Sequence, residues 1–203
     1  MRLRLAIGPL ALVFASACTP LFSDARMLRP GQVEVTPSVS PAFISEDGDT
    51  AHTWNDFGVR AQFGVTDRIN IGAGYNRSQL AIDNPESFGF HTVAFGPKFS
   101  LVANRLAVAV PVGFSFGENI DSDRWQLHPT VLMTVPMNDR VDFNPAFRLL
   151  IPTCDGCDTL IALHAGFGIR AARRLILRPE GVLIFNPGED GVIWTIGIGA
   201  SLR

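Results

Sequence analysis

Histidine, serine and acidic side chains are the groups through which this chain could do acid–base or nucleophilic chemistry. The four histidines are scattered along it: His52, His91, His128 and His164. A general base must lie within hydrogen-bonding distance of its partner, and Ser100, Ser115 and Ser201 have no plausible histidine or aspartate partner when strand face and depth are considered. The longest predicted loop, residues 78–88, holds acidic side chains but no histidine. The sequence predicts no catalytic site, so we expect a protein that is not an enzyme and carries no cofactor.

Cys154 and Cys157 form a Cys-x-x-Cys pair around an Asp-Gly turn. In an oxidising compartment such a pair most simply closes a disulfide, and we expect a disulfide here. A thioredoxin-like redox site would need the pair to open a helix, and nothing helical follows it. A zinc site would need two more ligands, and His164 lies too deep in its predicted strand to supply one. We therefore expect no metal site.

The first 18 residues have the pattern of an export signal. Arg2 and Arg4 precede an apolar run, and Ala15-Ser16-Ala17 is followed at once by Cys18. This arrangement resembles a bacterial lipoprotein signal, which would make Cys18 the acylated first residue of the mature chain. That signal usually has Leu where Ala15 stands, so ordinary cleavage after Ala17 is the alternative.

Alternating apolar and polar residues run from Gln32 to the end of the chain, which is the pattern of half-buried β-strands. Ten segments fit it: 32–44, 54–65, 68–77, 89–101, 104–117, 124–137, 140–151, 159–171, 174–186 and 191–202. Most have 10–14 residues, and a tilted strand that crosses a membrane needs about 9–11. No apolar run after the N-terminus is long enough for a membrane-spanning helix.

The connections between these segments alternate between tight turns and longer polar loops. Short turns at one end and long loops at the other are typical of outer-membrane barrels, with the turns in the periplasm. The predicted fold class is therefore all-β: a closed antiparallel up-and-down transmembrane β-barrel of about ten strands, with short periplasmic turns and longer outer loops. The predicted domains are a signal peptide (1–17), an N-terminal linker (18–31) that could carry a lipid anchor at Cys18, and the β-barrel (32–203).

The two faces of the predicted strands differ in kind. The polar face is rich in small residues and the chain has one lysine, Lys98, with a net charge of -2. This charge argues against a nucleic-acid partner, and small residues suit a narrow packed lumen. The apolar face should then meet lipid, with an aromatic girdle near the loop ends. The predicted girdle residues are Trp54, Tyr75, Phe90, Phe116, Trp125, Phe185 and Trp194, although Trp54 alternates with the inward face and faces lipid only if a bulge intervenes.

Charged residues on the lumen-facing side form the one candidate site. They are Glu34, Arg60, Lys98, Asp142, Arg148, Arg170, Arg178 and Glu180. Charges in a narrow interior are costly unless they pair, so the first interpretation is a packed ion-pair network. The alternative is a passage that uses the surplus of cations to select anions. Prolines within the predicted strands require bulges or local breaks.

Three stretches resemble small bacterial outer-membrane β-barrels of the porin-like or barrel-lipoprotein type: ARMLRPGQVEV (25–35), GVTDRINIGAGYN (64–76) and WTIGIGASLR (194–203). The resemblance implies the outer membrane of a Gram-negative bacterium, with lipid and the barrel-insertion machinery as partners. It names no protein partner. Such barrels usually end in an aromatic residue, whereas this chain ends in Leu202-Arg203.

Three functions are compatible with these features. The first is a structural or interaction role in the cell envelope, with a packed polar lumen. The second is a narrow pore for small polar or anionic solutes. The third is a soluble periplasmic barrel that binds an apolar ligand, in which case the apolar face would point inward.

Overall fold

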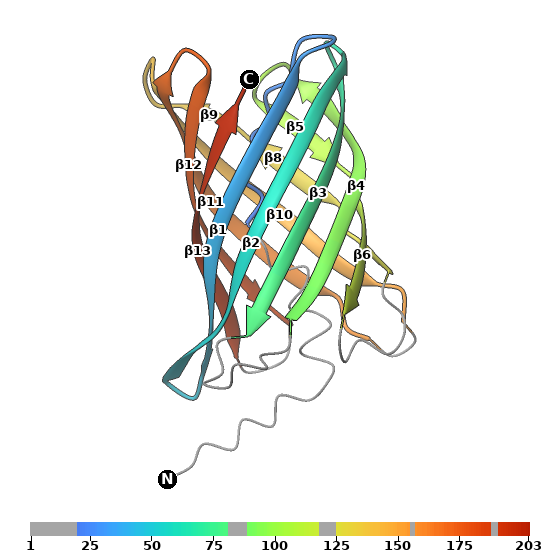
Figure 1. The fold of residues 1–203 in the computed structure, drawn as a ribbon, viewed down its shortest axis with the longest axis vertical. Helices are drawn as coiled ribbons and strands as arrows, with labels where there is room; N and C mark the ends of the chain where they lie inside the picture. The colour runs from blue at the N-terminus through green and yellow to red at the C-terminus, as the bar shows by residue number, and fades with distance from the viewer. Residues whose placement is uncertain (1–19, 81–88, 118–124, 155–156, 188–190) are drawn as a thin grey trace.

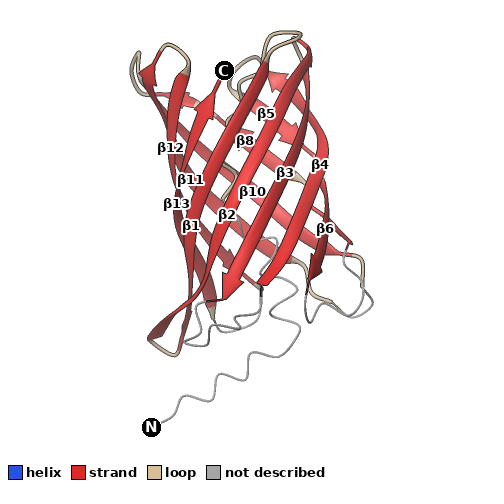
Figure 2. Ribbon diagram, in the orientation of Figure 1, coloured by secondary structure: helices blue, strands red, loops and turns tan. Residues whose placement is uncertain are grey.

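The computed structural model describes residues 20–80, 89–117, 125–154, 157–187 and 191–203 of the chain. In this part of the chain the strands form a tall closed cylinder (Figures 1 and 2). The strands are β1 (Val33–Glu46), β2 (Asp49–Thr66), β3 (Ile69–Leu80), β4 (Gly89–Val102), β5 (Leu106–Ala109), β6 (Val112–Gly117), β7 (Trp125–Leu127), β8 (Thr130–Met133), β9 (Val135–Pro136), β10 (Val141–Pro152), β11 (Leu160–Ala172), β12 (Leu175–Phe185) and β13 (Val192–Leu202). The described ranges hold no helix with the length and apolar character needed to span a membrane.

These segments make ten wall strands. The segments β5 and β6 together form one wall strand, and β7, β8 and β9 form another, because each set pairs with the same two neighbours. All pairings are antiparallel between strands adjacent in the chain, and β1 pairs with β13 to close the ring. The closed ten-stranded antiparallel barrel predicted from the alternation is confirmed.

Prolines interrupt the wall at two places. The gap between β5 and β6 contains Pro111, and the gap between β7 and β8 contains Pro129. Neighbouring strands still bond to these residues: His128 N donates to Pro111 O at 2.9 Å, and Leu149 N donates to Pro129 O at 3.0 Å. The missing proline N–H groups thus break the regular ladder locally while the cylinder stays joined.

The cylinder has two distinct ends. The turn end carries the short connections, such as residues 67–68 between β2 and β3, and the C-terminal Arg203 (top of Figure 1). The loop end carries the β1–β2 hairpin at residues 47–48, where Asp47 and Gly48 have positive φ values of 51° and 86°. A left-handed pair of this kind suits a tight hairpin turn.

Burial in the barrel is the reverse of that in a water-soluble protein. Outward side chains along the wall are apolar and exposed, with Ile71 and Phe95 each 53% exposed. Inward side chains are polar or charged and buried: Lys98 is 6% exposed and Glu180 is 5% exposed. The parity of a residue, meaning which of the two alternating faces of its strand it lies on, is therefore assigned correctly from the sequence for the wall. The apolar face points outward.

One part of the interior is apolar. Near the loop end, inward side chains pack into an apolar cluster consisting of Ala42, Trp54, Phe90, Leu150, Leu160, Ala162, Val182 and Ile184. Trp54 and Phe90 are 2% and 4% exposed, so their place in the predicted outer girdle is wrong. They share the inward parity of Asp56 and Thr92, and their rings fill the lumen. Tyr75 and Trp125 do face outward, at 39% and 48% exposed.

Residues 20–31, named here the plug segment, lie inside the cylinder. Leu21, Phe22, Ala25 and Leu28 are each at most 4% exposed, and Figure 1 shows the segment in blue behind the front strands. It leaves the interior at the turn end, where Gly31, with a φ of 79°, donates from its N–H to Gly64 O at 2.8 Å. The sequence has no periodicity here and suggests a linker; the structure instead packs the segment against the inner wall.

Candidate functional site in the barrel interior

Arg178 on β12 is the centre of the first group of interior charges. Its Nη2 lies 2.9 Å from Asp24 Oδ2 and 3.4 Å from Glu34 Oε1. Its Nε donates to Ser201 Oγ at 2.6 Å. The C-terminal Arg203 also bonds to Glu34 and lies 3.7 Å from Asp24. Two arginines and two carboxylates thus neutralise one another near the turn end, between the plug segment and the wall.

Asp24 belongs to the plug segment and is 5% exposed. Burial alone would raise the pKa of its carboxyl group, but the positive charges of Arg178, Lys98 and Arg203 together hold this pKa well below its ordinary value. Lys98 Nζ also donates to the backbone oxygens of Asp24 and Arg26, at 3.2 and 3.0 Å. Asp24 is therefore charged inside the barrel, where Arg178 on β12 bonds to its carboxylate and Lys98 on β4 to its backbone oxygen.

Glu180, also on β12, binds the beginning of the plug segment. The backbone N–H groups of Leu21 and Phe22 donate to its two carboxylate oxygens at 2.6 and 2.7 Å. His164 Nδ1 lies 2.8 Å from Glu180 Oε1. Further along the segment, Ala25 N donates to Thr134 Oγ1 at 2.9 Å. A carboxylate that accepts two backbone N–H groups makes strong charge-assisted bonds, so Glu180 anchors the segment.

Asp142 on β10 forms the third group. Arg26 Nη2 lies 2.8 Å from Asp142 Oδ1, and Arg170 Nη2 lies 2.9 Å from Asp142 Oδ2. The Arg170 side chain is 37% exposed, because it lies at the turn end of β11. This group ties the plug segment to β10 and β11.

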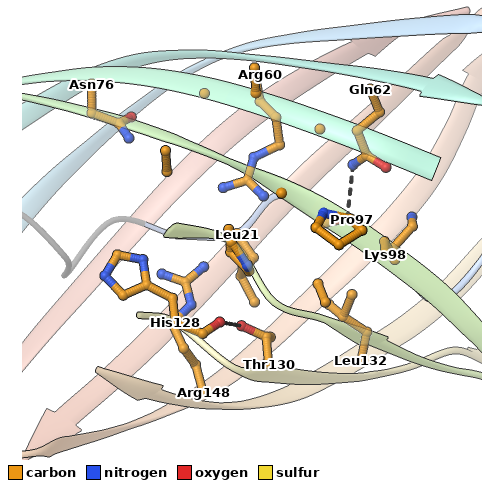
Figure 3. A pocket seen from close by; sticks show the side chains of 18 of the residues that line it. Leu21, Arg60, Gln62, Asn76, Pro97, Lys98, His128, Thr130, Leu132 and Arg148 are labelled. Carbon is orange, nitrogen blue, oxygen red and sulfur yellow. Dashed lines mark hydrogen bonds between the residues drawn. The ribbon is translucent and has the colours of Figure 1, made fainter. Parts of the chain in front are cut away.

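Arg60 and Arg148 lie apart from these ion pairs and line an internal cavity (Figure 3). The cavity is bounded by the plug residues Leu21 and Ser23, by small residues of β3 and β4, and by His128. The free volume of the cavity is about 70 Å³. The interior is thus packed at the turn end, apolar near the loop end and hollow between.

The structure places all eight predicted lumen charges on the inward side of the wall, but it divides them among these groups. Three partners were not foreseen: Asp24, Arg26 and Arg203, which lie before the first strand and after the last. Asp56 is a further buried carboxyl group that was not predicted, and it accepts bonds from Trp54 Nε1 at 3.1 Å and from Ser78 rather than from a cation. Asp56 has the same parity as Arg60, so the alternation could have found it.

The remaining predicted site residues are placed as follows. Cys154 and Cys157 are joined by a disulfide at the loop end. Cys18 lies outside the described residues. His128 and His164 point inward and bond to Gln126 and Glu180. Among the described residues, no three His, Cys, Asp or Glu side chains converge in a way that could hold a metal ion.

The fold is shared with known proteins, although neither a protein-family model nor a curated protein matches the chain by sequence. An outer-membrane channel from Pseudomonas putida F1 is similar with a TM-score of 0.51 and 10% identity, over 91% of this chain and 98% of that one. The translocator domain of the autotransporter NalP from Neisseria meningitidis has a TM-score of 0.48 at 8% identity, over 84% and 88%. Ail from Yersinia pestis has a TM-score of 0.43 at 11% identity, over 85% and 98%. The likeness to the Pseudomonas channel shows that this chain has the fold of an outer-membrane β-barrel.

Proposed function

We propose that this chain is an outer-membrane β-barrel of a Gram-negative envelope, with a closed lumen and a structural or interaction role rather than a catalytic one. The observation that carries the proposal is the inverted burial: apolar side chains face out along the wall, while ion pairs and the plug segment lie inside it. An exterior of this kind is stable in lipid and costly in water. Membrane lipid and the barrel-insertion machinery are therefore its expected partners.

The test is fractionation of cells that express the full chain, followed by a gel that compares boiled and unboiled outer membranes. We expect the protein in the outer membrane, with a heat-dependent change in migration. Purified protein in planar bilayers should show no steady conductance, because the plug segment occupies the lumen. Recovery of the protein in the soluble periplasmic fraction would overturn the proposal and favour the soluble alternative.

A narrow pore for small polar or anionic solutes is the second candidate function. The cationic side chains of the cavity favour it, because Arg60, Lys98 and Arg148 line it and the lining residues that the structure describes include no acidic one. Conduction would require the plug segment to leave the interior. Steady single-channel currents from the unaltered protein would favour this candidate over the closed barrel.

Acylation of Cys18 is a further part of the proposal and is supported by the signal-like pattern of residues 15–18. Mass spectrometry of the mature N-terminus tests this, and an unmodified first residue would rule out the anchor.

A further inference from the structure

Exposed arginines surround the turn end of the barrel. Five connections meet there: the β2–β3, β4–β5, β9–β10 and β11–β12 turns, and residues 29–31, where the plug segment leaves the interior. Each carries at least one exposed arginine, and we name these residues the rim arginines: Arg29, Arg68, Arg105, Arg140, Arg173 and Arg174. The connections follow one another around the ring of wall strands, so the rim arginines encircle the end at the top of Figure 1.

Carboxylates do not balance this positive charge. Among the described residues of this end, Asp67 and Asp139 are exposed beside the rim arginines, while the interior carboxylates pair with other arginines. All five connections lie within the described residues, and residues 1–19 contain no aspartate or glutamate. Six arginines against two aspartates therefore leave the rim with a net positive charge. The loop end differs, because Asp47 and Asp49 are exposed in its β1–β2 hairpin.

The rim arginines lie where the lipid-facing wall ends. Leu101 and Met137 are the most exposed large apolar side chains of the described residues, at 61% and 62%. Leu101 lies near the end of β4, just before the turn that holds Arg105. Met137 lies in the same turn as Arg140. Apolar side chains this exposed are stable in the hydrocarbon of a bilayer, so the neighbouring guanidinium groups should lie at the depth of the lipid headgroups, which long cationic side chains reach readily.

Arginine is suited to bind the phosphate of such a headgroup. Its guanidinium group presents parallel N–H donors that match two phosphate oxygens. Basic residues at a membrane surface attract anionic lipids, and this attraction falls off within a Debye length. The apolar side chains beside the rim favour a lipid partner over an acidic soluble protein, since a lipid covers these side chains and pairs with the arginines at once.

We propose that the rim arginines bind the phosphate headgroups of anionic phospholipids in the leaflet around the turn end. The inference rests on the proposed function, because the headgroups reach the rim only if the barrel spans a bilayer. It adds to that function a class of lipid and the part of the molecule that binds it.

The test is the lipid composition that the folded barrel retains. The full-length protein is refolded into vesicles of phosphatidylcholine, with and without phosphatidylglycerol, and folding is shown by boiled and unboiled gel migration. Native mass spectrometry then identifies the phospholipids that stay bound when the vesicles are dissolved in neutral detergent. We expect phosphatidylglycerol to be enriched at least about fivefold over its share in the vesicles, which corresponds to about 1 kcal/mol. The enrichment should fall as sodium chloride is raised.

A combined variant that removes four of the rim charges should lose most of this enrichment: Arg68→Gln, Arg105→Gln, Arg140→Gln and Arg173→Gln. The matched control replaces the same four residues by lysine, which keeps the charge, and it should retain much of the enrichment. Equal retention of the two lipids by the unaltered protein, enrichment that survives in the glutamine variant, or equal loss in the lysine control would each overturn the inference. A barrel that folds in vesicles without preferring phosphatidylglycerol contradicts only this inference, whereas a chain that folds in neither kind of vesicle contradicts the proposed function.

Discussion

Arg178 combines the features that make a buried ion pair sensitive to substitution. It is 2% exposed and bonds to Asp24, Glu34 and Ser201. Removing one member of a buried pair leaves the other charge without compensation, and the penalty exceeds the net benefit of the pair itself. The partners of Arg178 come from the plug segment, β1 and β13, so its loss acts on three elements at once.

Arg178→Gln should lower the free energy of unfolding by about 3 kcal/mol, because two buried carboxylates lose their shared cation. Urea unfolding of the protein in lipid vesicles, followed by gel migration, measures this. The matched control is Arg170→Gln, whose side chain is 37% exposed and whose partner Asp142 keeps Arg26. The control should cost about 1 kcal/mol or less. Equal losses in the two variants would contradict the role given to Arg178.

Protonation of the Asp24 carboxyl group should determine how docking of the plug segment depends on pH. Because the folded-state pKa of this carboxyl lies below its ordinary value, its contribution to stability is complete above the ordinary value and is lost only as the pH falls through the folded one. Docking should therefore be constant from about pH 8 to pH 5 and weaken only in strong acid. Protease protection of the plug segment against pH measures this, and Asp24→Asn should lose part of the acid-side dependence while Glu180 and Asp142 keep the rest. Release near pH 6 would be inconsistent with Asp24 as the anchor.

Parity explains which interior residues the sequence could reveal. Every predicted lumen charge lies on an alternating strand, and each one does point inward. Asp24 and Arg203 lie outside the alternating region, where no local pattern indicates that a side chain is buried. Their places depend on contacts between residues at opposite ends of the chain, and these contacts exist only after the ring closes.

At the scale of elements, the plug segment is the least regular part of the described chain and yet one of the best bonded. It has no strand, but its backbone donates to Glu180 and Thr134 and accepts from Lys98. Buried backbone groups need such partners, and here wall side chains supply them in place of a sheet. The interior charges of the wall thus serve to hold this segment.

Glu180→Gln should loosen the beginning of the plug segment. A neutral amide replaces a carboxylate that accepts two backbone N–H groups, and bonds to charged groups contribute about 1.5–3 kcal/mol each. We expect single-channel openings in planar bilayers that the unaltered protein lacks. Glu46→Gln, at the exposed β1–β2 hairpin, is the control and should stay closed. A closed Glu180→Gln barrel would show that other contacts suffice to hold the segment.

The apolar exterior of the whole molecule should make the barrel stable in lipid rather than in water. Phe95 lies midway along β4 and is 53% exposed, whereas Leu101 lies near the turn end and is 61% exposed. An arginine on the lipid face costs about 2–4 kcal/mol at the bilayer midplane and about 0–1 near the interfaces. Phe95→Arg should therefore destabilise the barrel in lipid vesicles far more than Leu101→Arg. Equal small effects would indicate that this face meets water.

The whole fold was more predictable than its interior. The period of two in the sequence predicts ten strands and which residues face in or out. The alternation of short turns and longer loops predicts the two ends of the barrel. The apolar cluster was not predicted, because Trp54 and Phe90 are equally suited to an outer girdle and to a packed lumen. Only the inward parity that they share with Asp56 and Thr92 separates these possibilities.

The pairing of β1 with β13 has a consequence for the order of assembly. Thr36 Oγ1 and Ser201 Oγ meet across this seam although they are 165 residues apart in the chain. The cylinder therefore cannot be complete until the last strand has been delivered. The plug segment directly precedes β1, so it is present from the start and needs no later entry through a narrow mouth. The wall can close around it as the final step, and the charges that hold it can guide that step.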